Sequence, residues 1–212
     1  MNPVKIVFLG DSITGASNLA HYMKFSHIVE CMIEARWGAG HAAALNRGIA
    51  GDTTGGVLKR LQSDVLDVEP DIVVLLIGGN DAGDSQPEEV TRTNLGQIAT
   101  SLRAAGTRVL MLQYHLLPNP ANPEAAWKHL ISNNSVIAEV AAGMNFPVLD
   151  MQPSMQAALE TQEVTELVNG LDGVHLNPGG ELIYARTVFA KLLELGWLDD
   201  AHNRPCFVLN GV

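Results

Sequence analysis

The sequence predicts one α/β domain built on a parallel sheet, and three observations support this prediction. Short, nearly continuous apolar runs recur along the chain, as is typical of strands buried on both faces. Between them lie segments with apolar residues three and four positions apart, the spacing of amphipathic helices. The 212 residues are 47% hydrophobic and 17% charged, which suits a chain that buries one large core. Alternating strands and helices favour an α/β fold.

Five apolar runs are expected to form the strands of this sheet. They are Val4–Leu9, Ala43–Ile49, Ile72–Ile77, Arg108–Tyr114 and Phe146–Asp150, of which the second has the weakest pattern. Each run is five to seven residues long, which is the length of a strand and not of a helix. A sheet of such strands needs helices on both faces to exclude water.

Three helices are expected from apolar spacing and from signals at their ends. The first follows Thr53-Thr54, the second stops at Gly106, and the third begins at Asn177-Pro178 and stops at Gly196. The apolar stripes are Leu58, Leu61, Val65 and Val68 for the first, Leu95, Ile98, Leu102 and Ala105 for the second, and Leu182, Ala185, Phe189, Leu192 and Leu193 for the third.

The composition argues against several classes of partner and site. Asp and Glu number 23 against 13 Lys and Arg, a formal net charge of -10, and nucleic acid or anionic lipid would require clustered basic residues. Cys31 and Cys206 lie far apart and are expected to be free thiols, and no histidine has metal-ligand spacing. No run approaches the roughly 18 apolar residues of a membrane span. We therefore expect a cytoplasmic protein without a membrane span.

Glycines and polar residues follow the predicted strands. Gly10-Asp11-Ser12 follows the first, Gly48–Asp52 the second, Gly78–Asp81 the third, and His115 the fourth. Because the carboxyl ends of parallel strands meet at one edge of a sheet, these residues are expected to lie close together. Asp172-Gly173-Val174-His175 comes later, in a polar loop before the last helix.

These residues suit acyl transfer. The Ser12 hydroxyl is a weak nucleophile and needs a neighbouring base, which His175 can supply. Asp172, three residues from His175, can hold the imidazole in one tautomer and stabilise its positive form. The amide of Asn80 and backbone N–H groups at the glycine turns can stabilise an oxyanion.

Other interpretations of the same residues remain open at this stage. Ser12 could be a helix N-cap, Gly51 could serve only a positive φ angle, and Asp172 and His175 could share only a local hydrogen bond. Residues 10–15 nearly match the phosphate loop GxxxxGK[ST], although Ala16 stands in the place of its lysine. Two alternative functions follow, a nucleotide- or phosphate-binding protein and a catalytically silent binding module.

Several further polar and aromatic residues have two interpretations. His115 could line the site or act as a second base, but a packed or solvent-facing histidine is expected. Asp11, Asp52 and Asp81 are expected to stabilise turns or cap helices. Trp127 could wall a substrate pocket or pack in the core.

Four blocks in register make the chain resemble the GDSL, or SGNH, hydrolases. The blocks are Gly10-Asp11-Ser12-Ile13, Asn46–Gly51, Gly78–Asp81 and Asp172–His175, in the family's order and spanning residues 10 to 175. The first block departs only slightly from the pattern, with Ile13 where many members have leucine. A single block is not specific to this family, but four blocks in the family's order are strong evidence for the resemblance.

The resemblance implies a fold, a mechanism and roles for individual residues. The fold would be a flavodoxin-like three-layer α/β/α sandwich with a five-stranded parallel sheet. Ser12 would be the nucleophile, His175 the general base and Asp172 the group that orients it. The Ser12 N–H, the Gly51 N–H and the Asn80 side chain would form the oxyanion hole. Family members cleave esters and thioesters through an acyl-enzyme and need no cofactor or metal.

Residues 1–198 are expected to form a single SGNH-hydrolase-like domain, and residues 199–212 a C-terminal tail. Acyl length and leaving group would depend on the expected loops Leu116–Pro123 and Met151–Gly170. The sequence leaves a lipid, a thioester and an acetylated sugar open as substrates, and it leaves the oligomeric state open.

Overall fold

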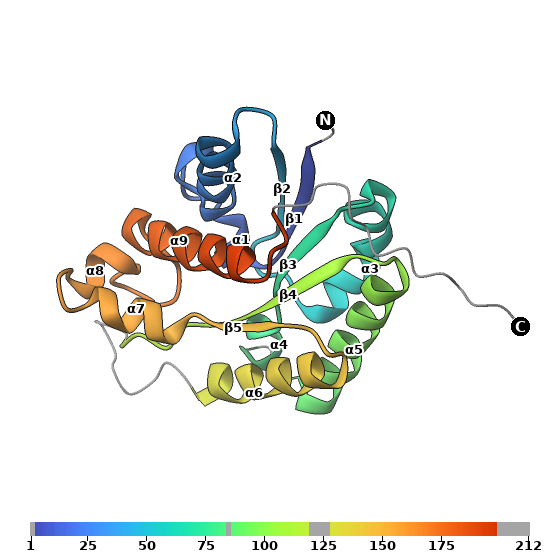
Figure 1. Ribbon diagram of the computed structural model, residues 1–212. Helices are drawn as coiled ribbons and strands as arrows, with labels where there is room; N and C mark the ends of the chain where they lie inside the picture. Colours follow the sequence, from blue (N-terminus) through green and yellow to red (C-terminus); the bar gives the residue numbers. More distant parts are fainter. Residues whose placement is uncertain (1–2, 84–85, 119–127, 199–212) are drawn as a thin grey trace, which may run out of the picture.

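A computed structural model of the protein describes residues 3–83, 86–118 and 128–198, and its centre is one parallel sheet (Figure 1). The strands are β1 (Val4–Gly10), β2 (Ala42–Gly48), β3 (Ile72–Leu76), β4 (Arg108–Gln113) and β5 (Val148–Asp150). They lie in the order β2-β1-β3-β4-β5, and every neighbouring pair is parallel. All five predicted strands are present, and their ends differ from the predicted ends by at most two residues.

Helices cover both faces of the sheet and make three layers. The longer ones are α2 (Phe25–Trp37), α3 (Thr54–Asp64), α5 (Glu88–Ala104), α6 (Lys128–Gly143) and α9 (Pro178–Glu194). Helices α2 and α9 pack on each other over one face, and α3, α5 and α6 lie side by side over the other (Figure 1). The short helices are α1 (Ser12–Gly15), α4 (Gly79–Gly83), α7 (Gln152–Ala158) and α8 (Val164–Leu167), with 3-10 turns at His21–Met23 and Leu66–Val68. This arrangement confirms the predicted α/β/α sandwich.

The three predicted helices are present, but their predicted apolar stripes are partly wrong: Val65 and Val68 lie beyond the end of α3, and Ala105 lies beyond the end of α5. Helix α3 begins as expected, because the Thr53 side chain caps it by accepting the Gly56 N–H at 3.2 Å. Helix α5 ends at Ala104, and Gly106 follows it with φ 71°. The predicted stripe of α9 is partly wrong. Leu182 is 36% exposed, whereas Tyr184, Ala185, Val188 and Leu192 are buried.

Asn177 precedes α9 at the cap position, but its side chain does not cap the helix. The amide donates to the carbonyl oxygens of Thr165 at 2.6 Å and Val168 at 3.0 Å. It therefore ties the start of α9 to α8. The prediction that Met151–Gly170 is a loop is wrong, because this segment contains α7 and α8. Both of these helices pack against α9. Sequence periodicity does not reveal helices as short as these.

The register of the strands aligns the ends that carry the candidate residues. Gly10 at the end of β1 lies opposite Gly48 of β2 on one side and Leu76 of β3 on the other. The loops after these three strands therefore start at the same level of the sheet. The strands themselves are the centre of the hydrophobic core, and all five residues of β3 are buried.

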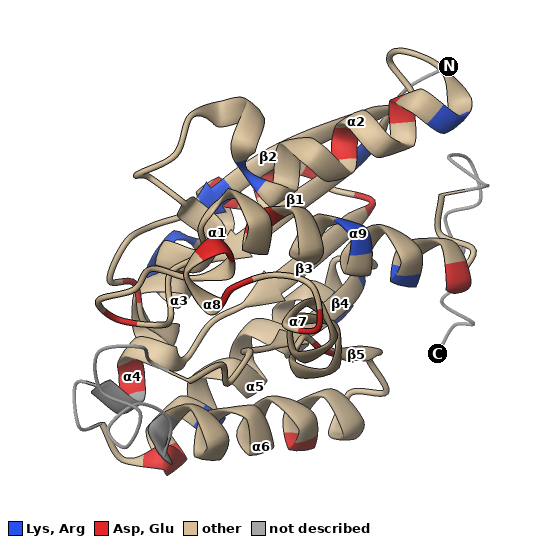
Figure 2. Cartoon of the chain, turned by 90° about the vertical axis from the view of Figure 1, so that its left-hand side faces the viewer, with Lys and Arg blue, Asp and Glu red and all other residues tan. Residues whose placement is uncertain are grey.

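Figure 2 shows where the charged residues lie along the fold. Among the described residues seen in Figure 2, Lys and Arg are scattered over several elements and form no continuous basic face. None of the described helices has the length and hydropathy needed to cross a membrane. Cytoplasmic location stays a prediction. Cys31 is a free thiol on α2, while Cys206, Trp127 and the predicted tail 199–212 lie outside the described residues.

Candidate active site

Ser12 is the first residue of α1, directly after the glycine turn that ends β1. Asp11 precedes it as the N-cap, and its Oδ1 accepts the Ile13 N–H at 3.0 Å. Ser12 is thus not the helix cap, and the predicted turn-stabilising role of Asp11 is confirmed. The Asp11 carboxyl also occupies an N–H group that a phosphate loop would offer to its ligand. Ser12 is left with its hydroxyl free of any capping task.

Helix α1 lies unusually close to β2. A Cβ atom at Gly48 would lie 2.1 Å from the Gly15 nitrogen and 2.6 Å from its Cα, so only glycine fits there. Asn46, two residues earlier, bridges the two elements. Its Nδ2 donates to the Thr14 carbonyl oxygen at 2.7 Å, and its Oδ1 accepts the Gly48 N–H at 2.9 Å. These contacts fix Ser12 relative to the turn that follows β2.

Ser12, His175 and Asp172 form a continuous chain of hydrogen bonds. Ser12 Oγ lies 2.8 Å from His175 Nε2, and His175 Nδ1 lies 3.0 Å from Asp172 Oδ2. The other Asp172 oxygen accepts the backbone N–H groups of Val174 at 2.8 Å and His175 at 3.0 Å. The side chains of His175 and Asp172 are 41% and 38% exposed, so this end of the chain is open to solvent.

The environment of Asp172 favours its ionised form. Partial burial alone would raise the pKa of its carboxyl, but the backbone bonds and the histidine together outweigh burial and lower it. An ionised carboxylate accepts the Nδ1 proton and leaves Nε2 as an acceptor for the serine hydroxyl. In this tautomer the histidine can take a proton from Ser12.

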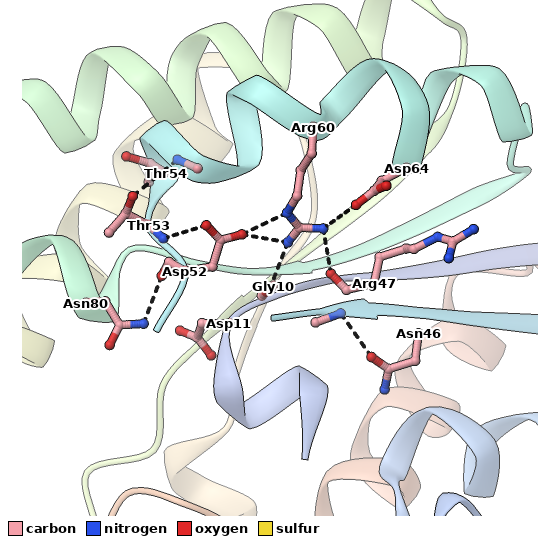
Figure 3. Close-up of polar contacts among 12 residues, drawn as sticks. Gly10, Asp11, Asn46, Arg47, Asp52, Thr53, Thr54, Arg60, Asp64 and Asn80 are labelled. Atoms are coloured by element: carbon pink, nitrogen blue, oxygen red, sulfur yellow. Dashed lines mark hydrogen bonds and ion pairs between the residues drawn. The ribbon is translucent and has the colours of Figure 1, made fainter. Parts of the chain in front are cut away.

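Gly51 and Asn80 lie at the ends of β2 and β3, and one contact joins their segments. Gly51 has φ 74°, within a turn closed by the Asp52 N–H and the Ile49 carbonyl oxygen at 3.2 Å. Asn80 Nδ2 donates to the Asp52 carbonyl oxygen at 2.8 Å (Figure 3). An amide nitrogen carries two hydrogens, so the second can be offered to a ligand.

Tyr114 is a residue of this site that sequence reasoning missed. Its buried hydroxyl donates to the Asp11 carboxyl and accepts the Gly79 N–H at 3.1 Å. It thus connects the residue before Ser12 with the residue before Asn80. Burial raises the pKa of Asp11 to about 6, although the bonds from Tyr114 and Ile13 lower it. Burial and the neighbouring Asp11 carboxyl together raise the pKa of Tyr114 well above its ordinary value.

His115 and Asp81, which the sequence left with more than one interpretation, are both buried and make hydrogen bonds within the fold. His115 is buried, its Nδ1 lies 2.7 Å from the Tyr184 hydroxyl, and burial lowers its pKa to about 4, which confirms the packed interpretation. Asp81 is buried and accepts the Thr54 N–H at 2.9 Å, so it caps α3 from a distance. Within residues 3–83, 86–118 and 128–198, no cluster of three His, Cys, Asp or Glu side chains could hold a metal.

Parts of this chain are similar in sequence to proteins that are named as esterases. An arylesterase of Vibrio mimicus is 28% identical over 116 residues, which are 54% of this chain and 56% of the relative. Esterase TesA of Pseudomonas aeruginosa is 37% identical over 75 residues, 35% of this chain and 37% of the relative. The matched segments thus span about half and about a third of these two proteins.

The fold and the family agree with these likenesses. The lipase/acylhydrolase of Enterococcus faecalis has a crystal structure with 26% identity and a TM-score of 0.75, matching 92% of this chain and 97% of that one. The GDSL-like Lipase/Acylhydrolase family matches residues 8–183, which hold all four sequence blocks. With Ser12, Gly51, Asn80 and His175 gathered at the carboxyl edge of this sheet, the chain belongs to the GDSL-like Lipase/Acylhydrolase family.

Proposed function

We propose that the protein hydrolyses carboxylic esters or thioesters through an acyl-enzyme formed on Ser12. The observation that carries this proposal is the hydrogen-bonded chain from Ser12 Oγ through His175 to Asp172, at 2.8 and 3.0 Å. A serine hydroxyl within reach of an imidazole that is itself oriented by a carboxylate is the arrangement that activates a serine nucleophile.

The first half-reaction acylates the enzyme. Ser12 Oγ attacks the acyl carbon while His175 Nε2 takes the hydroxyl proton, and the resulting oxyanion is stabilised by the Ser12 N–H, the Gly51 N–H and Asn80 Nδ2. The intermediate collapses, the bond to the leaving alcohol or thiol breaks, and His175 gives that group its proton. The imidazolium that exists between these two transfers is stabilised by Asp172.

The second half-reaction restores the free enzyme. Water attacks the acyl carbon, His175 takes one of its protons, and the acid departs as the proton returns to Ser12 Oγ. The protein's own residues supply every proton transfer. The solvent-exposed histidine gives water direct access to this step.

Release of p-nitrophenol from acyl esters of graded chain length tests the proposal. We expect turnover by the wild type and a loss of at least about 10⁴-fold for Ser12→Ala and His175→Ala, with a smaller loss for Asp172→Ala because its role is indirect. Ser135→Ala is the matched control, since this hydroxyl on α6 donates within its own helix, to the Ile131 carbonyl oxygen at 3.2 Å. Ester hydrolysis that survives in Ser12→Ala would contradict the mechanism.

The same series addresses the substrate class. A maximum at acetyl or propionyl esters would favour small acyl groups such as those on acetylated sugars, and a maximum at longer chains would favour lipids or acyl thioesters. Thermal stabilisation by ATP, FMN or NAD, with no ester turnover, would instead support the alternative of a nucleotide-binding protein.

A further inference from the structure

The Arg60 side chain on α3 makes four hydrogen bonds and one further ion-pair contact within the described structure (Figure 3). Nε donates to Asp52 Oδ2 at 2.8 Å, and Nη2 lies 2.7 Å from the same oxygen in an ion pair. Nη1 donates to the Arg47 carbonyl oxygen at 2.9 Å and to Asp64 Oδ2 at 2.7 Å. Nη2 donates to the Gly10 carbonyl oxygen at 3.1 Å. One guanidinium thus joins its own helix to the end of β1 and to residues 47–52 at the end of β2.

Two of these contacts hold the carboxyl ends of neighbouring strands. The Gly10 carbonyl belongs to the last residue of β1, two residues before Ser12. The Arg47 carbonyl belongs to β2, four residues before Gly51. The Gly10 carbonyl also accepts the Ile49 N–H at 3.0 Å, so the turn after β2 is bonded to the end of β1 at the same atom. Arg60 therefore fixes the Ser12 N–H and the Gly51 turn relative to each other.

The contact with Asp52 extends this arrangement to Asn80. Asp52 follows Gly51 directly, and its Oδ1 accepts the Thr53 N–H at 2.9 Å while Arg60 holds its Oδ2. The backbone carbonyl of the same Asp52 accepts the Asn80 amide at 2.8 Å. The orientation of the Asn80 side chain thus depends on a residue whose own side chain is clamped by Arg60.

The clamp is largely shielded from water. The side chains of Arg60 and Asp52 are 14% and 10% exposed. A charge pair with so little water around it keeps a fixed geometry, and removing one partner leaves the other uncompensated. The remaining partner, Asp64, is 26% exposed and lies one turn along α3, so it balances the charge from the side away from the strands.

We propose that Arg60 is a positioning residue that aligns the three oxyanion donors, the Ser12 N–H, the Gly51 N–H and Asn80 Nδ2. This inference rests on the proposed function. We assign Arg60 no role in binding the acyl group, because its guanidinium is held by Asp52, Asp64 and two backbone carbonyl oxygens. Its effect is therefore on stabilisation of the transition state and not on affinity for the ground state.

Arg60→Lys is the discriminating variant. Lysine keeps the positive charge but has three donors on one atom, and it cannot reproduce the planar contacts to Asp52 and two carbonyl oxygens. We expect kcat to fall about 10- to 100-fold, with KM within about threefold of the wild type and the pH midpoints of the rate profile unchanged. Asp52→Asn, which weakens the same clamp from the other side, should give the same pattern if Arg60→Lys does not fold.

A double-mutant cycle with Asn80→Ala separates positioning from a general effect on structure. If Arg60 acts through the oxyanion donors, Arg60→Lys should cost less kcat in the Asn80→Ala background than in the wild type, because the part of its effect that passes through Asn80 is already lost there. Arg92→Lys is the matched control. This arginine on α5 pairs with Glu88, Glu89 and Glu139 at a more exposed position, and its replacement should leave kcat unchanged.

Three outcomes decide the matter. Folded Arg60→Lys and Asp52→Asn variants with wild-type kcat, or losses that multiply in the double mutant, would overturn the role of Arg60 while leaving the esterase mechanism intact. A wild type without ester turnover, or an active Ser12→Ala variant, would refute the proposed function, and the role of Arg60 with it. A selective, non-multiplying fall in kcat supports both.

Discussion

The carboxyl group of Glu181 gives a quantitative test of how α9 is docked. Glu181 lies in the first turn of α9 and is 0% exposed, and its Oε2 accepts the Phe25 N–H at 2.5 Å. Phe25 is the first residue of α2, and the preceding Lys24 provides no side-chain cap. The carboxyl therefore caps α2 from a position 156 residues away in the chain. The other oxygen, Oε1, has no hydrogen-bond partner among the described residues.

Burial raises the pKa of Glu181 from 4.5 to about 8, and the Phe25 N–H and the Lys24 charge only partly counteract it. Between these two values the native state holds a proton that the unfolded state has lost. The free energy of unfolding therefore falls as pH rises, by about 1.4 kcal/mol per pH unit. Over the interval from 4.5 to about 8 the fall is on the order of 3–5 kcal/mol.

Glu181→Gln should remove this dependence on pH. Glutamine can still accept the Phe25 N–H and carries no charge, so the variant should match the wild type near pH 4.5 and exceed it in stability by several kcal/mol near pH 8.5. Urea unfolding of both proteins at pH 5, 6, 7, 8 and 9 measures the difference. Asp11 and His115 titrate in both proteins, so their contributions cancel.

The exposed Glu160 provides the control, since Glu160→Gln should shift the curve little at any pH. A stability difference between Glu181→Gln and the wild type that stays constant from pH 5 to 9 would refute the reasoning. It would mean that the buried carboxyl is already ionised in the native protein at pH 5.

Three further predictions concern the site and its support. Gly51→Ala and Gly40→Ala form a matched pair, because both glycines have positive φ, 74° and 79°, with open space around the missing Cβ. Each should lose about 1–2 kcal/mol in urea unfolding, but only Gly51→Ala should lower kcat, because strain in its turn would shift the Gly51 N–H; equal rates for both would contradict that dependence on the turn. Gly48→Ala should lower stability by about 1–3 kcal/mol or more, because the new methyl group meets backbone atoms of α1; an unchanged melting temperature would contradict that close contact. Tyr114→Phe should cost about 1–3 kcal/mol, since Asp11 and the Gly79 N–H each lose a partner, and it should raise the pKa of Asp11, measurable by NMR titration; an unmoved pKa would argue against the bond.

The sequence predicts best those parts of the site that the sheet itself brings together. Ser12, Gly51 and Asn80 each follow a strand directly, so the rule that parallel strands end at one edge is enough to group them. The partnership of Asp172 with His175 is local and also readable. Arg60 has no such signal, because two of its acceptors are backbone carbonyls, which any residue could provide. Tyr114 similarly reads as the end of a strand, and only packing shows that its hydroxyl reaches Asp11.

Tertiary packing also explains where the helix predictions were wrong. The predicted apolar stripe of α9 includes Leu182, but the helix buries Glu181 and Tyr184 and leaves Leu182 exposed. Sequence patterns do not predict that a glutamate side chain is buried, since burying a charge is costly without a partner. Asn177 was expected to cap α9, but α8 offers its amide two carbonyl acceptors. Because local propensity does not predict α8, it cannot predict that the Asn177 amide bonds to α8 instead of capping α9.

The Ser12–His175 contact joins residues 163 positions apart, and this has a consequence for biosynthesis. A nascent chain that has released its first four strands from the ribosome already carries the serine, but it has no imidazole beside it. If Ser12 is the nucleophile that we propose, His175 can activate its hydroxyl only after residue 175 has emerged and α9 has docked. The ester hydrolysis that we propose would therefore begin only after the sheet and α9 have assembled around Ser12.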